Sequence, residues 1–186
     1  MKFFPALTEE HRAFVARQPV FFVATAAEGA RINLSPKGMH SFRVLDANTV
    51  AYLDVGGSGN ETNAHLAADG RITIMFCAFD QPALIFRIYG TGRAVLPQDT
   101  EWADLYARFT PLPGTRQIFV ISVGEVQTSC GWGVPFMTLE RERQTLSKYH
   151  AAQAGTERLA KWAVRTSSID GLPVRVATVL PDGGGA

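Results

Sequence analysis

The sequence predicts a single, mainly β domain with peripheral helices, in which six strands form an antiparallel barrel. Its 186 residues suit one domain with a sizeable core. Apolar residues make up 46% of the chain and charged residues 19%, which is typical of a folded globular protein. Short β-rich runs follow one another at hairpin spacing, and the helical stretches between them do not alternate regularly with the strands. This arrangement favours an antiparallel barrel over a doubly wound parallel sheet.

The amino-terminal part predicts a helix followed by a β-hairpin. Thr8 is a capping residue type, and the helix that it caps runs to about Arg17, with acidic residues in its first turn. Pro19 ends this helix. The β-rich runs 20–25 and 31–35 come next, separated by a short segment that contains a glycine, and this pattern predicts a hairpin.

The rest of the barrel is expected from four more apolar runs. These strands are predicted at 49–54, 71–79, 84–95 and 117–129, with a turn at 80–82. A short helix is expected at 64–69, and Asp99 is expected to cap another. Four apolar residues of that second helix share one face, which suits core or dimer packing: Trp102, Leu105, Tyr106 and Phe109.

The barrel core therefore spans about 19–135 of a domain that covers 1–186. A mostly polar helical region, about 138–164, is expected to follow it on the surface, interrupted at Gly155. The glycine-rich tail at 181–186 is expected to have no ordered structure.

Composition argues against several classes of protein. The formal net charge is +1 and there is no basic tract, so a nucleic-acid partner is not expected. No apolar run is long enough to cross a bilayer, and the amino terminus lacks the apolar stretch of a signal peptide, so no membrane association and a cytoplasmic location are expected. Cys77 and Cys130 lack paired spacing and the four histidines are scattered, so we expect free thiols and no metal site.

Three segments carry the residue types that a ligand site needs. The first places Asn33, Ser35, Pro36, Lys37 and Gly38 at the end of a strand. A lysine there is a mobile point charge that suits a phosphate. Taken alone, the segment is better explained by an exposed lysine in a turn.

The second segment is a glycine-rich loop that leads into a helix, with Ser58, Gly59, Asn60, Thr62 and Asn63. Glycines let backbone amides approach an anion, hydroxyls donate hydrogen bonds, and a helix start favours negative charge. The order of glycines matches neither a P-loop nor a dinucleotide motif. A tight turn with a helix cap explains the same residues.

The third segment places Trp132 between Gly131 and Gly133, directly after the last strand. A tryptophan between two glycines can lie against a flat ring. A hydrophobic lid on the core is the commoner role of a single tryptophan.

Taken together and in this order, the three segments resemble the pyridoxamine 5′-phosphate oxidase-like family of FMN-binding split β-barrels. The resemblance is best over 19–95, and 131–135 is a further point of similarity. It implies a homodimer that holds FMN in a groove between its two chains. It also implies that Ser35 and Lys37 line the flavin, and that Trp132 of the partner subunit packs near the isoalloxazine ring. The remaining residues would face the phosphate and ribityl chain: Ser58, Asn60, Thr62 and Asn63.

The resemblance further implies an FMN-dependent oxidoreductase that exchanges hydride with a nicotinamide or a small organic substrate. No catalytic side chain is assigned. In the enzyme that names the family, a carboxy-terminal segment rich in arginine and tryptophan grips the substrate, and 171–176 has no such pattern. The oxidation of pyridoxamine phosphate is therefore not expected. Two alternatives stay open: a flavin or haem carrier or sensor without turnover, and a deazaflavin-dependent reductase. The reductase is less favoured because Lys37 and Arg31 supply few cations.

Overall fold

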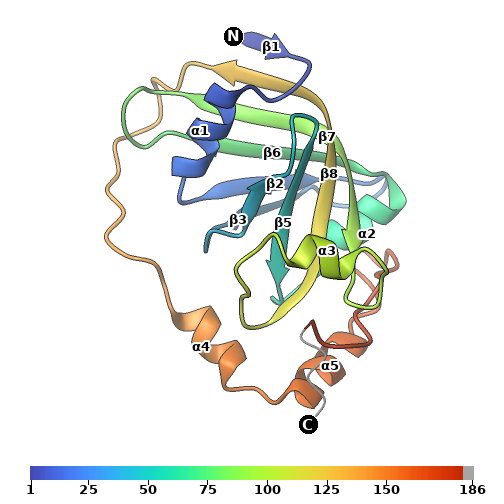
Figure 1. Ribbon diagram of the computed structural model, residues 1–186. Helices are drawn as coiled ribbons and strands as arrows, with labels where there is room; N and C mark the ends of the chain where they lie inside the picture. The colour runs from blue at the N-terminus through green and yellow to red at the C-terminus, as the bar shows by residue number, and fades with distance from the viewer. Residues whose placement is uncertain (182–186) are drawn as a thin grey trace.

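The structure is a computed structural model in which residues 1–181 are described. Eight strands form one antiparallel sheet that curls into a barrel (Figure 1). The hydrogen-bonded order is β3-β2-β6-β7-β8-β5-β4, and β1 pairs with β8. The predicted fold class is confirmed. The two additional strands, β1 (Lys2–Phe4) and β4 (Phe42–Val44), have three residues each, too few to show an alternation of apolar and polar residues.

The other six strands lie close to the predicted runs. They are β2 (Phe21–Thr25), β3 (Asn33–Lys37), β5 (Thr49–Val55), β6 (Arg71–Cys77), β7 (Ile85–Val95) and β8 (Thr115–Ser129). The predicted hairpin is confirmed, since β2 pairs antiparallel with β3. β3 and β4 lie at the two ends of the strand order although they are neighbours in the chain. The barrel is therefore split between β3 and the β4–β5 pair.

Helix α1 (Glu9–Arg17) packs against the main core. Thr8 is its N-cap, as predicted: the Thr8 hydroxyl accepts a hydrogen bond from the His11 amide, and His11 Nδ1 accepts one from the Thr8 amide. Phe14 and Val15 face inward, and the Phe14 ring lies 6.0 Å from that of Phe86. Apolar burial on this face holds the helix on the sheet.

Two short helices follow β5 and β7. Helix α2 (Glu61–Ala68) begins three residues before the predicted start. Helix α3 (Trp102–Tyr106) is capped by Glu101, so the prediction that Asp99 caps it is wrong: Asp99 belongs to the preceding turn, where its carbonyl accepts a bond from the Trp102 amide. The apolar face predicted for α3 and the residues after it packs on a second core cluster around Leu53 and Ile118.

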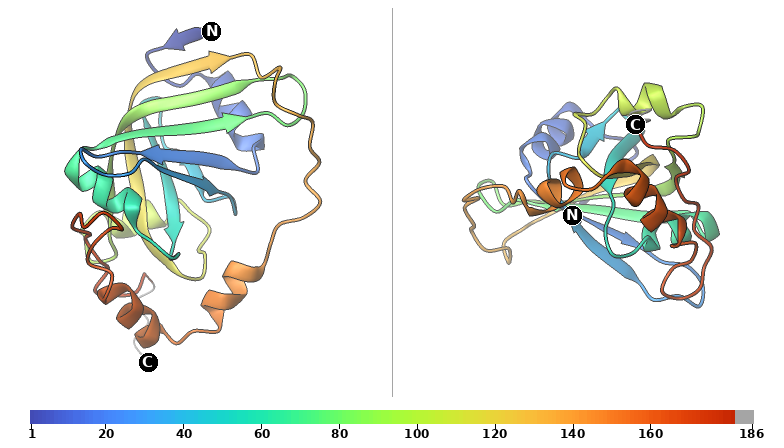
Figure 2. Two further views of the ribbon diagram at one scale, coloured as in Figure 1. Left: turned by 180° about the vertical axis from the view of Figure 1, so that it is seen from behind. Right: turned by 90° about the horizontal axis from the view of Figure 1, so that it is seen from below.

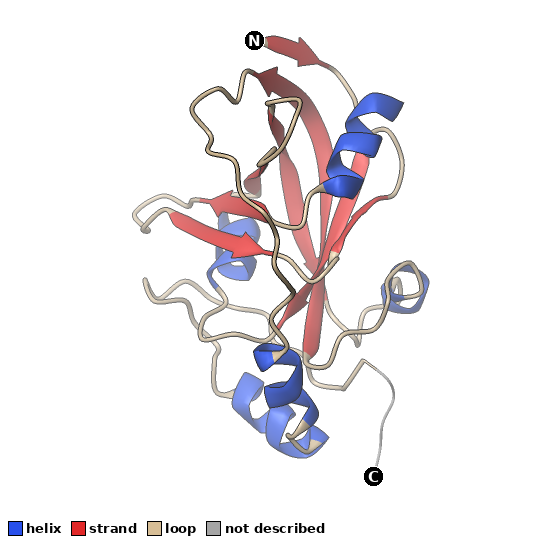
Figure 3. Cartoon of the chain, turned by 90° about the vertical axis from the view of Figure 1, so that its left-hand side faces the viewer, coloured by secondary structure: helices blue, strands red, loops and turns tan. Residues whose placement is uncertain are grey.

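The carboxy-terminal extension differs from the predicted single helical region. Residues 130–144 form a long loop, followed by α4 (Thr145–Ala151) and α5 (Gly155–Ala163) (Figure 2). Figure 3 shows these two helices together at the end of the barrel opposite the amino terminus. Although most of their residues are polar, His150 and Trp162 are buried. His150 Nε2 lies 2.7 Å from the Gly56 carbonyl, so the extension is docked on the barrel.

The chain then returns over α2 as a segment that we call the strap, residues 165–178. Ion pairs and hydrogen bonds join it to the barrel, including the pairs Arg31–Asp170 and Arg175–Asp99. Most of the tail predicted at 181–186 lies outside the described residues. Within the described part of the chain, no helix has the length and apolar character needed to span a bilayer.

Gly114→Ala is expected to undock α4. Gly114 has φ +83°, and a Cβ there would lie 2.2 Å from His150 Cγ. The left-handed backbone alone costs about 1–3 kcal/mol for a residue with a side chain, and the clash pushes His150 away from Gly56. We expect a lower free energy of unfolding in urea and loss of hydrogen-exchange protection in 145–163.

Gly171→Ala is the matched control, because Gly171 has φ +81° but open space around its Cβ position. Its loss in the free energy of unfolding should reflect the left-handed backbone alone, without a clash with a neighbouring side chain. Equal losses in both variants, with α4 still protected, would contradict the docking role of His150.

Candidate functional site

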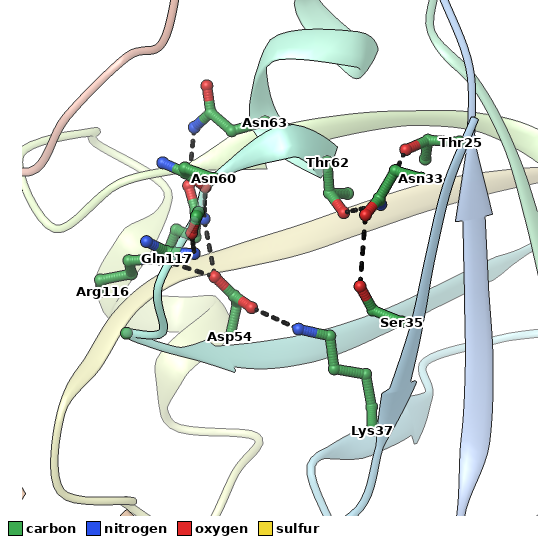
Figure 4. Close-up of polar contacts among 12 residues, drawn as sticks. Thr25, Asn33, Ser35, Lys37, Asp54, Asn60, Thr62, Asn63, Arg116 and Gln117 are labelled. Carbon is green, nitrogen blue, oxygen red and sulfur yellow. Dashed lines mark hydrogen bonds and ion pairs between the residues drawn. The ribbon is translucent and has the colours of Figure 1, made fainter. Parts of the chain in front are cut away.

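Three polar side chains of β3 form a row on one face of the strand. Asn33, Ser35 and Lys37 alternate with the exposed residues Leu34 and Pro36, as the pleat of a strand requires. They are half-buried and point across the split toward β5 and α2 (Figure 4). The first predicted segment is therefore part of a strand that faces a polar site, and Lys37 is not a free turn lysine.

Lys37 is paired with a buried carboxylate on β5. Its Nζ lies 2.9 Å from Asp54 Oδ1, and Asp54 is 2% exposed. The other carboxylate oxygen, Oδ2, accepts bonds from Arg116 Nε and Gln117 Nε2, both at 2.8 Å. One carboxylate thus joins two cations from different strands, β3 and β8, and the three charges sum to +1.

These contacts determine the ionisation of Asp54. Burial would raise the pKa of this carboxyl group, but Arg116, then Lys37 and a hydrogen bond from Gln117 lower it, and together they hold the pKa of Asp54 well below its usual range. Asp54 is therefore ionised at neutral pH. A buried charge of this kind is stable only because both cations stay in place.

The loop between β5 and α2 is fastened to the start of β8. Arg116 Nη2 donates to the Gly59 carbonyl at 2.8 Å, and Gln117 Nε2 donates to Asn60 Oδ1 at 2.6 Å. Asn60 is 8% exposed, so its carboxamide serves this internal contact. Within residues 1–181 the Ser58 hydroxyl has no hydrogen-bond partner and remains available to a ligand.

Asn63 does not face the same space. It is 1% exposed, its Nδ2 donates to Gln117 Oε1 and to the Arg175 carbonyl, and its Oδ1 accepts from the Arg175 amide. The expectation that Asn63 meets a phosphate does not agree with these contacts, because every polar atom of the side chain is used to hold the strap.

Thr62 points from α2 toward β3 and completes a second polar network. Asn33 Nδ2 donates to Thr62 Oγ1 at 3.1 Å and to Thr25 Oγ1 at 3.2 Å, while the Ser35 hydroxyl donates to Asn33 Oδ1 at 3.3 Å. Thr25 in turn contacts Nδ1 of the buried His65. Asn33 is thereby fixed, and Ser35 keeps its lone pairs for a further hydrogen bond.

An acidic side chain closes the amino end of α2. Glu61 Oε2 accepts a bond from the Ile169 amide of the strap at 3.0 Å. Glu61 Oε1 lies 2.8 Å from the position that a Cβ on Gly59 would take. A carboxylate here opposes an anion at the helix start, so the cations of the Asp54 cluster offer the better position for one.

Comparison with known proteins agrees with this architecture. A protein-family model described as pyridoxamine 5′-phosphate oxidase matches residues 7–130. A relative from Aspergillus flavus, the pyridoxamine 5′-phosphate oxidase family protein ustO, is 38% identical over 176 residues, which cover 92% of this chain and 70% of the relative. The chain belongs to the pyridoxamine 5′-phosphate oxidase family.

Solved structures share the fold of this family member at low sequence identity. A putative pyridoxamine 5′-phosphate oxidase from Lactobacillus delbrueckii superposes with a TM-score of 0.56 and 19% identity, over 68% of this chain and 99% of that one. A variant of HupZ from Group A Streptococcus gives a TM-score of 0.53 and 21% identity, over 66% of this chain and 98% of that one. These likenesses support the split-barrel fold.

Within one chain of this family member, Trp132 lines a different cavity from the β3–α2 site. It is 87% exposed and lines a cavity of about 220 Å³ with Phe79 and other residues that follow β6. Helix α2 ends just before β6 begins, whereas the residues that line this cavity follow β6. The structure does not bring Trp132 together with the other predicted site residues.

Four residues of the site were not predicted from the sequence: Asp54, Arg116, Gln117 and Glu61. Asp54 did carry a signal, because it is a carboxylate inside the apolar run of β5. The other three stand at the ends of elements, where polar residues are common. In the described part of the chain, no group of three His, Cys, Asp or Glu side chains is placed to hold a metal ion.

Proposed function

We propose that this protein is an FMN-binding oxidoreductase that holds the flavin beside β3 and the β5–α2 loop. One observation carries the proposal: Lys37 and Arg116 converge on Asp54 beside the polar row of β3. Membership of the pyridoxamine 5′-phosphate oxidase family supports it.

The donor set fits a phosphorylated ligand. A phosphate needs a cation and several hydrogen-bond donors. The Lys37 ammonium group has three donor protons and uses one on Asp54, and its side chain is 25% exposed. The Ser58 hydroxyl and the amides around Gly59 add donors. Asp54 offsets one of the two positive charges of Lys37 and Arg116. Glu61 opposes an anion at the start of α2. Lys37 therefore supplies most of the electrostatic attraction for the phosphate.

The chain's own residues bind and orient the flavin. FMN, once bound, would supply two-electron chemistry at its N5 atom. Lys37 would compensate the negative charge of the phosphate, and the Ser35 oxygen would accept a hydrogen bond from the ligand. The Asn33–Thr62 hydrogen bond fixes the position of the polar row on β3. Hydride exchange would involve a nicotinamide or a small organic substrate.

The proposal includes a homodimer, in which Trp132 of a second copy would pack at this site. Large apolar side chains are exposed on the loop after β8, on β3 and on the residue before β3, where a partner would cover them. They are Trp132, Phe136, Met137, Leu139, Ile32 and Leu34. Light scattering should give the mass of two chains, whereas a monomer would remove this part of the proposal.

The cofactor proposal is tested by the absorption spectrum of the purified protein and the mass of the released pigment. We expect a flavin spectrum and the mass of FMN. A deazaflavin mass, a haem spectrum, or a colourless protein that takes up no FMN would contradict it. Mixing the yellow protein with NADH or NADPH without oxygen should bleach it, and persistent colour would favour a carrier or sensor over nicotinamide-driven turnover.

Trp132→Ala is expected to weaken FMN binding several-fold and to alter the flavin spectrum, because stacking on an aromatic ring contributes about 1 kcal/mol. Stability should change little, since Trp132 is exposed. Phe136→Ala is the matched control, from the same loop and 74% exposed. A loss of stability without any effect on FMN would instead assign Trp132 to packing.

A further inference from the structure

A second cavity lies between α1 and the turn that joins β3 to β4, and Gly38, the residue after Lys37, is at its edge. Its volume is about 340 Å³, within the range of small-molecule sites. Three phenylalanines, Phe21, Phe42 and Phe76, line it and contact one another with ring centroids 5.1 to 5.6 Å apart. Such a wall suits a flat apolar group, which can add a further edge or face contact.

One polar side chain of this cavity has no hydrogen-bond partner among residues 1–181. Ser41 is 5% exposed and lines the cavity, and its hydroxyl makes no hydrogen bond within the described residues. The hydroxyl oxygen does not belong to the fully buried atoms that lack a partner, so it stays accessible. It is therefore available to a hydrogen-bonding group of a ligand.

The turn that carries Ser41 is held in an unusual conformation. Met39 and His40 both have positive φ, 61° and 50°, although neither is glycine, and the Ser41 amide donates to the Gly38 carbonyl. Arg43 braces the turn, since its Nη1 donates to the carbonyls of His40 and Phe42, both at 2.8 Å. Strained backbone of this kind is concentrated at ligand sites.

The charge of the cavity favours an anion. Arg12 and Arg43 line it, and among residues 1–181 no carboxylate does. In the same part of the chain, the one ion pair of Arg12 is with Glu9, which is 92% exposed, and such a surface pair is weak and easily replaced. A ligand carboxylate beside Arg12 and Ser41 would thus gain a cation and a hydroxyl, while its ring lies on the phenylalanines.

We propose that this cavity is a binding site for a small aromatic carboxylate, separate from the flavin site. The phenylalanines hold the ring, and Arg12 and Ser41 hold the carboxylate. The site does not depend on bound flavin.

The probe is 4-fluorobenzoate, followed by fluorine NMR on the full-length protein. We expect saturable binding, at least about tenfold weaker binding of the neutral analogue 4-fluorobenzyl alcohol, and no displacement by excess FMN. Equal binding of the neutral analogue would overturn the anion assignment. Displacement by FMN would place the probe in the flavin site and overturn the separate site, without bearing on flavin binding itself.

Substitutions at residues that line the cavity test whether 4-fluorobenzoate binds there. Arg12→Gln should weaken binding about tenfold and Ser41→Ala several-fold, while Arg17→Gln on the same helix, outside the cavity, should leave it unchanged. Ala16→Trp should block the cavity without unfolding the protein, because Ala16 lies at its exposed edge. Unchanged affinity in a folded Ala16→Trp or Arg12→Gln variant would overturn the proposal.

Discussion

Asp54→Asn is expected to lower the free energy of unfolding by about 3–5 kcal/mol at pH 7, because removing one partner of a buried ion pair leaves the others uncompensated. Arg116, whose side chain is 9% exposed, would lose its carboxylate, and Lys37 would lose its partner across the split. Urea unfolding at constant temperature measures the loss.

The loss of stability caused by Asp54→Asn should become smaller as the pH falls. Because the folded-state pKa of Asp54 lies below the ordinary value of about 3.9, its ionised form stabilises the fold fully above that value. The stabilisation declines as the pH falls toward the folded-state pKa. The difference between wild type and Asp54→Asn should therefore shrink between about pH 5 and pH 3. Asp104→Asn, at an exposed site on α3, is the control.

Lys37→Met is expected to weaken FMN binding by roughly 10- to 100-fold, the effect of losing a charge-assisted hydrogen bond. Lys37→Arg should keep most of the affinity because the charge is retained. Fluorescence titration with FMN measures both, and Lys148→Met, at an exposed residue of α4, is the control. Unchanged affinity in Lys37→Met would move the phosphate site elsewhere.

The same variant should also cost some stability, which the sequence alone did not suggest. A lysine after a proline in a strand end looks like a surface cation, yet its side chain is only 25% exposed and rests on Asp54. The loss should be smaller than in Asp54→Asn, since Asp54 keeps Arg116 as a partner. Measuring unfolding and FMN affinity on the same samples separates the two effects.

Much of the fold could be predicted because its signals are local. In β2, buried and less buried side chains alternate over five consecutive residues, and Phe21, Val23 and Thr25 are the buried ones. The start of α1 depends on Thr8 and the next turn. The extension could not be predicted in the same way: its polar composition indicated a surface helix, but the burial of Trp162 depends on a cluster with Leu96 and Ala177.

For the candidate site too, local features could be predicted from the sequence, whereas contacts between distant residues could not. The sequence by itself determined which segments carry ligand-binding residue types, the family resemblance that they support, and a strand that ends at Ser35. Only the tertiary structure decided that Lys37 shares Asp54 with Arg116, that Asn63 holds the strap, and that Trp132 lines a separate cavity. The physical reason is that hydrophobic alternation and caps act between near neighbours in the chain. The Asp54 ion pairs join residues 17 and 62 positions apart, and they exist only once the sheet has curled and brought β3, β5 and β8 around one buried carboxylate.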